Sequence, residues 1–224
     1  MIVGYGLIDS DGDGFAVDPG CKSAAIDPCF VAGQRFTQGS LDVMRWNTEE
    51  RWGSVAISLH WLIAALILLV QIPAGIAMLR VDPGALQDTL FNIHKNIGLV
   101  VFGLALVRVG WRLANPVPAL PLDVPGWQER IANLTHFLLY ALLFLLPISG
   151  YLYTAFGGFP VPLFMIWELG DFVPASEAQA AIWQAIHYWS QWALYAVVTL
   201  HVAGALHHHF VQDDEVLRRM LTSR

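Results

Sequence analysis

Four long apolar stretches dominate this chain, and each is long enough to cross a lipid bilayer as a helix. They cover about residues 55–79, 91–109, 131–152 and 180–210. A hydrocarbon core about 30 Å thick needs roughly 20 apolar residues of helix, and backbone groups in lipid must be hydrogen-bonded within their own segment. The stretches therefore predict an all-α integral membrane protein, built as a four-helix up-down bundle.

The composition supports a membrane protein and restricts its chemistry. Charged residues make up only 13% of the 224 residues and hydrophobic residues 56%, whereas a soluble domain carries about 25% charge. Both cysteines, Cys21 and Cys29, precede the first stretch. The membrane part therefore cannot ligate an iron–sulfur cluster through thiolates or attach haem through C-x-x-C-H. No nucleic-acid partner is expected.

The positions of the charges predict the orientation in the membrane. The connections after the first and third stretches carry two cations against five acids. The remaining flanks carry most of the cations, and cytoplasmic flanks are enriched in Lys and Arg. We therefore expect both termini and the middle connection to be cytoplasmic, and segment 157–174 to lie along the outer surface as a lid. The cations of the cytoplasmic flanks are Arg45, Arg51, Arg108, Arg112, Arg130, Arg218, Arg219 and Arg224.

Residues 1–43 differ in composition from the membrane domain, residues 44–224. The run Asp9-Ser10-Asp11-Gly12-Asp13-Gly14 resembles the start of a calcium loop, but Gly20 stands where that loop needs a bidentate glutamate. We expect either a disordered tail or a start assigned too early, with Met44 as the alternative beginning.

Four of the histidines inside the apolar stretches stand out: His60, His94, His187 and His201. An ionisable side chain in a bilayer is costly and points to function. His187 and His201 are fourteen residues apart, which is about 21 Å along a helix and close to four full turns, so they share one face. Because chain direction alternates, His60 and His201 should share the inner level, and His94 and His187 the outer level.

Two imidazole pairs at two depths predict two b-type haems, each held by a histidine from either side. Such six-coordinate iron carries electrons and has no open position for substrate. Hydrogen-bonded structural histidines are one alternative. A histidine-lined zinc or copper transporter is another, although the stretches contain no Asp, Glu or Cys. Gly98, Gly103 and Gly204 either admit a porphyrin to the backbone or serve ordinary helix packing.

Motifs in all four stretches resemble the prokaryotic cytochrome b561 family, over about residues 46–219. They are Ser58-Leu59-His60-Trp61-Leu62, Ile93-His94-Lys95-Asn96-Ile97-Gly98, Arg108…Arg112…Asn115-Pro116, His136…Tyr140, Leu146-Pro147-Ile148-Ser149-Gly150 and His187…His201…His208-His209-Phe210.

The resemblance implies a multi-pass bacterial inner-membrane protein with two haems b. In that family the ligand positions match His60 with His201, and His94 with His187. It also implies a superoxide:ubiquinone oxidoreductase, which oxidises superoxide at the periplasmic face and reduces ubiquinone. The alternative is a cytochrome b membrane subunit that relays electrons for a partner dehydrogenase or hydrogenase.

Three further residues are candidates for the reaction itself. Lys95 adjoins His94 and, like Arg80, could attract an anionic donor, although the outer connections have a net charge of −3. His136 could donate a hydrogen bond or proton to a quinone, or cap a helix start. His208 lies seven residues after His201 and could bind a quinone or a haem propionate.

Arg108 and Arg112 lie four residues apart on one helix face. They could neutralise haem propionates, or anchor the helix as positive-inside residues.

Overall fold

The computed structural model describes residues 45–119, 124–163, 167–169 and 173–221. The calcium-like motif, both cysteines and Met44 lie outside these residues, as does Arg224.

The first long helix is continuous but contains a wider turn. It consists of α2 (Ser54–Ala65), the π-helix η1 (Leu66–Gln71) and α3 (Ile72–Ala77). Pro73 stands at the start of α3 and has no N–H to donate. At the join, the N–H of Ile72 donates to the carbonyl of Ile67, five residues back. The wider π-turn thus accommodates Pro73 without interrupting the helix.

Three more long helices follow, α4 (Ala85–Ala114), α5 (Gly126–Phe156) and α6 (Glu177–His207). α4 ends at the residue before Asn115-Pro116, where a proline disfavours helical backbone in its predecessor. At the start of α6, the Ser176 side chain caps the helix by accepting from the N–H of Gln179. Each predicted apolar stretch falls on one of the four long helices, and the helical architecture is confirmed.

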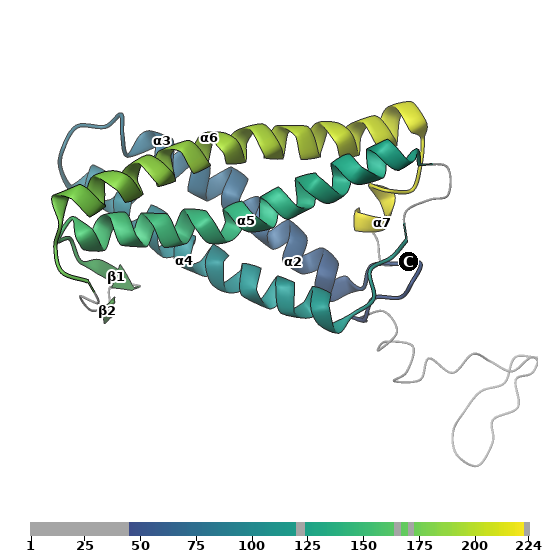
Figure 1. The fold of residues 1–224 in the computed structure, drawn as a ribbon, viewed down its shortest axis with the longest axis horizontal. Helices are drawn as coiled ribbons and strands as arrows, with labels where there is room; N and C mark the ends of the chain where they lie inside the picture. Colours follow the sequence, from purple (N-terminus) through teal and green to yellow (C-terminus); the bar gives the residue numbers. More distant parts are fainter. Residues whose placement is uncertain (1–44, 120–123, 164–166, 170–172, 222–224) are drawn as a thin grey trace, which may run out of the picture. The chain divides into compact units, whose positions relative to one another are not determined.

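The helices pack side by side around a common core. α6 lies against α5, α5 against α4, and α4 against the first long helix (Figure 1). All four contribute to one buried cluster, which consists of Ile63, Ile67, Val101, Leu142 and Leu194. Leu194 is midway between His187 and His201 on α6, so this apolar layer separates the two histidine levels.

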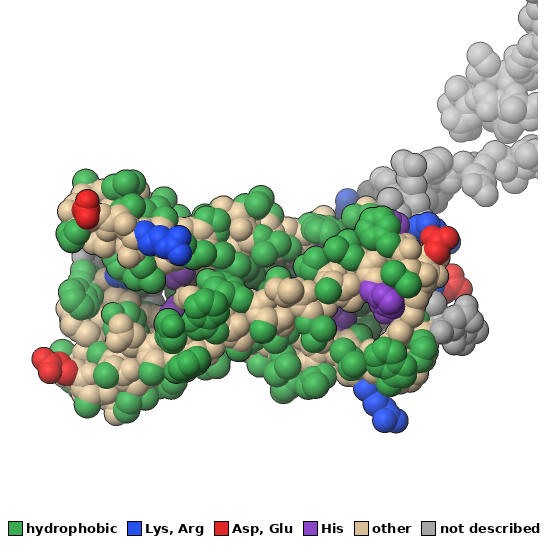
Figure 2. All heavy atoms as spheres, turned by 90° about the horizontal axis from the view of Figure 1, so that it is seen from above, with side chains coloured by type: hydrophobic (Ala, Val, Ile, Leu, Met, Phe, Trp, Pro, Cys, Tyr) green, Lys and Arg blue, Asp and Glu red, His purple; other side chains and the backbone are tan. Residues whose placement is uncertain are grey.

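Three helical segments of the described residues are long and apolar enough to span a membrane: Ser54–Ala77, Ala85–Ala114 and Gly126–Phe156. α6 is as long as α5, and its crossing stays a prediction. Apolar side chains cover the visible face of the bundle, with charged residues near its two ends (Figure 2). Large apolar side chains such as Leu69 and Trp189 are 74% and 69% exposed, as lipid contact requires.

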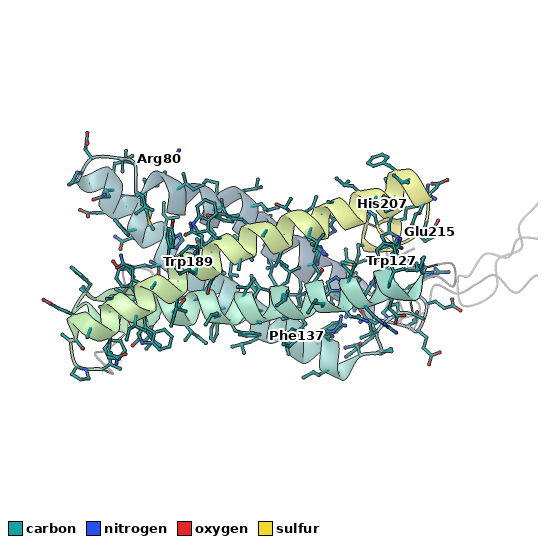
Figure 3. The ribbon with its side chains drawn as sticks, turned by 45° about the horizontal axis from the view of Figure 1, so that its top comes forward. Arg80, Trp127, Phe137, Trp189, His207 and Glu215 are labelled. Atoms are coloured by element: carbon teal, nitrogen blue, oxygen red, sulfur yellow. The ribbon has the colours of Figure 1, made fainter. Side chains whose placement is uncertain are left out.

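Small elements occupy the two ends of the bundle. The strands β1 (Val161–Leu163) and β2 (Trp167–Leu169) pair antiparallel in the connection from α5 to α6. They lie within segment 157–174, for which a lid but no strands was predicted. The opposite end holds η2 (His208–Gln212) and α7 (Arg218–Leu221) (Figure 1). Figure 3 shows Arg80 at the first end, and Trp127, His207 and Glu215 at the second.

Two histidine pairs in the bundle

The structure brings the four histidines together in the predicted pairs. His60 of α2 and His201 of α6 have ring centroids 6.1 Å apart. His94 of α4 and His187 of α6 have centroids 6.2 Å apart. Two imidazole nitrogens that bind one iron at about 2 Å each place their ring centroids roughly 6 Å apart. Both pairs therefore have the spacing that two imidazoles would need to bind one iron.

The ring of His94 is oriented by the first long helix. Its Nδ1 lies 3.3 Å from the carbonyl oxygen of Gln71. A carbonyl only accepts, so Nδ1 carries the proton and Nε2 keeps its lone pair. This arrangement, in which the far nitrogen donates to a backbone carbonyl, is the usual one for a metal-bound histidine.

The ring of His187 is oriented in the same way by α5. Its Nδ1 lies 3.0 Å from the carbonyl oxygen of Leu146 and 3.1 Å from the hydroxyl of Ser149. The ring also packs on Gly150, where a Cβ would come within 3.1 Å of the imidazole. The Nε2 of His187 is therefore also left free for a metal.

The His60–His201 pair has polar side chains as neighbours. The guanidinium of Arg108 donates to the carbonyl of Ala56 at 3.0 Å, and its other nitrogen lies 3.3 Å from the Nδ1 of His60. The ring of His136 lies 5.3 Å from that of His201. The predicted candidates Arg108 and His136 thus both reach this pair.

A cavity of about 170 Å³ adjoins the His94–His187 pair. Both of these rings line it, together with Lys95, and its wall is otherwise mostly apolar. The Nζ of Lys95 lies 3.5 Å from the carbonyl oxygen of Pro160, next to β1. A flat, apolar cofactor with charged edges could pack against the apolar wall and place one charged edge near Lys95.

Of the remaining predicted residues, Gly98 also lines this cavity. His208 pairs with Asp214 and belongs to the C-terminal turn. Apart from the adjacent residues and backbone of the same helix, no described atom lies within 4 Å of a Cβ built on Gly103 or Gly204, whereas one built on Gly98 would meet the side chain of Gln71.

Several residues of the site were missed in the sequence. Gly75 and Gly150 support the rings of His94 and His187, and Gln71 and Gln191 line the cavity. The signal for the two glutamines was available, because an amide in an apolar membrane stretch is unusual. Gly150 belongs to a family motif but was given no role. Gly75 had no signal of its own, since membrane helices use many small residues for packing.

The fold and the site define a helical membrane protein that holds two histidine pairs at two levels of one bundle. The model of the family described as prokaryotic cytochrome b561 matches residues 51–223, and the chain belongs to that family. It is 33% identical to cytochrome b561 homolog 2 of Escherichia coli (strain K12), over 78% of this chain and 93% of that protein. It is 30% identical to homolog 1 of the same organism (78% and 98%) and 25% identical to the probable superoxide oxidase CybB of Yersinia pestis (79% and 98%).

The family resemblance in the sequence is therefore confirmed, and with it membrane electron transfer and oxidoreductase chemistry. The family implies a b-type haem. The residues present fit that group, since both pairs have the ligand spacing and the Nε2 atoms of His94 and His187 are free. Within the described residues, no three His, Cys, Asp or Glu side chains gather to hold a metal ion.

Proposed function

We propose that the chain is a four-helix, di-haem cytochrome b of the bacterial inner membrane, with α6 as its fourth span. Electrons would pass from a periplasmic donor to ubiquinone, by way of haems held by His94 with His187 and by His60 with His201. The observation that carries the proposal is the pair of 6 Å ring spacings, one on either side of the apolar core.

The protein's own part is to hold the ligands and exclude water. The carbonyls of Gln71 and Leu146 keep the Nδ1 protons of His94 and His187, so each ring presents Nε2. The layer of Ile63, Val101 and Leu194 keeps water from the space between the two levels. A bis-histidine b haem supplies one-electron relay without an open coordination position.

Superoxide is the donor we favour, and the observation behind it is the similarity to a probable superoxide oxidase. Lys95, next to His94 and on the cavity wall, would attract an anionic donor. His136, next to His201, would donate a hydrogen bond or proton to a quinone carbonyl on the cytoplasmic side. Both termini would then be cytoplasmic.

The first experiment is a dithionite-reduced-minus-oxidised visible spectrum of the detergent-purified protein, with pyridine-haem quantitation. The proposal expects a sharp low-spin b-type α-band and about two haems per chain. A colourless protein that copurifies with zinc or copper would overturn it.

A second experiment tests the donor. Quinone reduction is followed in purified protein supplied with an enzymatic superoxide source, with superoxide dismutase as the control. Reduction that the dismutase abolishes supports superoxide. A haem-loaded protein that is inactive with superoxide and copurifies with a dehydrogenase or hydrogenase subunit would favour the relay function instead.

A further inference from the structure

Gln71 is the one side-chain amide in the stretch Leu62–Ala77, and it lies at the end of the π-turn, opposite His94. Its Nε2 donates to the backbone carbonyl of His94 at 3.0 Å. In return, the Nδ1 of His94 lies 3.3 Å from the backbone carbonyl of Gln71. Two hydrogen bonds in opposite directions thus join the same two residues across two helices.

The packing around these two residues is reciprocal as well. The ring of His94 lies over Gly75, where a Cβ would come within 3.1 Å of Cε1. The amide of Gln71 lies over Gly98, where a Cβ would come within 3.1 Å of Nε2. Each helix therefore offers a polar side chain and, four residues later on the same face, a glycine that receives the partner's side chain.

The amide of Gln71 also faces the cavity. Gln71, Gly75, His94 and Gly98 all line it. Nothing among the described residues donates to the buried Oε1 of Gln71. The other end of the amide cannot be exchanged with it, because the carbonyl of His94 requires a donor.

We propose that Gln71 is a positioning residue for His94 as an iron ligand, acting through the interlock of Gln71 and Gly75 with His94 and Gly98. The backbone carbonyl of Gln71 keeps the proton on Nδ1. The side-chain amide of Gln71 holds the backbone of His94 in place, so that the ring keeps its position and rotation. This proposal rests on the proposed function, because it assumes that a haem binds at His94. Removing groups that orient a metal ligand typically weakens metal binding about 10–100-fold.

The test compares Gln71→Leu with Gln87→Leu in the purified holoprotein. Gln87 is the matched control, because its Nε2 also ties α4 to the first long helix, through the carbonyl of Met78 at 3.0 Å, but it does not line the cavity. Two properties are measured: the rate of haem transfer to an excess of a haem-scavenging apoprotein, and the low-spin ferric EPR signal, which depends on the orientation of the imidazole planes.

Gln71→Leu should accelerate loss of one haem about 10-fold or more and shift one EPR signal, leaving the other haem unchanged. Gln87→Leu should alter neither property. Gln71→Glu should restore most of the wild-type behaviour, since a protonated carboxyl keeps one donor and one acceptor. An unchanged Gln71→Leu protein, or an equal effect of Gln87→Leu, would overturn the proposal.

Gly98→Ala provides a second route if Gln71→Leu does not insert. The added methyl displaces the Gln71 amide without removing it, and should shift the same EPR signal; Gly110→Ala, with no described atom within 4 Å of its Cβ, should not. An unchanged signal in Gly98→Ala would also count against the interlock.

The wild-type spectrum is recorded first. If the wild-type spectrum shows no haem, both the proposed function and the interlock are wrong. If the wild-type protein has its full haem content but Gln71→Leu changes neither haem loss nor the EPR signal, only the interlock is wrong.

Discussion

The His94–His187 pair and the His60–His201 pair have nearly equal ring spacings, 6.2 and 6.1 Å, but different neighbours. The first pair hydrogen-bonds through Nδ1 to backbone carbonyls of two other helices. In the second pair, the Nδ1 of His60 faces the guanidinium of Arg108. A carbonyl is fixed by its helix, whereas a long side chain can move between partners.

The difference has a consequence for the tautomer. Arginine only donates, so the Nδ1 of His60 accepts and the ring proton lies on Nε2. Ligation of iron through Nε2 requires that proton to leave. The His94–His187 pair already presents both Nε2 lone pairs. We therefore expect the His94–His187 pair to be the more rigid ligand set, and the His60–His201 pair to be tuned by the charge of Arg108.

The largest expected effect separates the two pairs completely. His94→Ala or His187→Ala should remove one haem and spare the other, because one imidazole cannot fill both axial positions. His60→Ala or His201→Ala should remove the complementary haem. Pyridine-haem quantitation and potentiometric titration would measure this.

His207→Ala is the matched control, since His207 is the last residue of α6 and is exposed. Loss of both haems from a correctly inserted variant would indicate cooperative assembly. If all four variants retained both haems, these histidines would not be the haem ligands.

The second effect tests the backbone support of His187. Gly150→Ala places a methyl 3.1–3.2 Å from its ring atoms, tighter than ordinary contact, so the ring must shift. We expect about 10–100-fold weaker retention of that haem. Gly110→Ala should have no such effect, as no described atom lies within 4 Å of its Cβ. Haem transfer to an apoprotein measures both, and equal rates would show that the close packing does not matter.

The helices and the pairing of the four histidines were predictable, because they depend on rules that act along the chain. Hydrophobic length sets the helices, and helix period with alternating chain direction sets which histidines share a level. The family was predictable from short motifs around these residues and is confirmed. The roles of the histidines as ligands stay predictions.

Contacts between helices were not predictable, because they depend on the relative height and rotation of separate segments. Nothing in the sequence aligns Gly75 with His94 or Gly150 with His187. The π-turn before Pro73 rotates the rest of that helix, which a regular period does not anticipate. The pairing of His208 with Asp214 is another such contact, and the role of His208 toward a quinone or a haem propionate stays a prediction.

A smaller effect concerns the charge of Arg108. A cation near the iron favours the reduced, less positive state, so Arg108→Gln should lower one midpoint potential by an amount on the order of tens of millivolts. The other potential should change less, because the charge lies at the His60 level. Redox titration of the α-band measures both.

Arg130→Gln controls for a general change of surface charge. Arg130 is exposed on α5 and belongs to none of the ion pairs of the described residues. If both potentials in Arg108→Gln moved equally, the proposed contrast between the pairs would be wrong.

The smallest effect concerns the C-terminal turn, which meets the bundle at the His60 end. The indole N–H of Trp61 donates to the carbonyl of Met220 at 2.7 Å, and His208 pairs with Asp214 in a partly buried site. Asp214→Asn should weaken that pair and increase local opening of the turn roughly five-fold, since such a bond contributes about 1 kcal/mol. Hydrogen exchange at the amides of residues 216–220 measures it.

The exposed Arg218 offers the comparison for this turn. Its ion pairs with Asp213 and Glu215 lie at the surface, so Arg218→Gln should change exchange less than Asp214→Asn does. Both variants should keep the haem content and both midpoint potentials, because the hydrogen bond from the bundle to this turn comes from Trp61. A shifted potential in Asp214→Asn would mean that the His60–His201 pair depends on the turn as well as on Arg108, and the set of side chains that tunes it would have to be extended to the C-terminus.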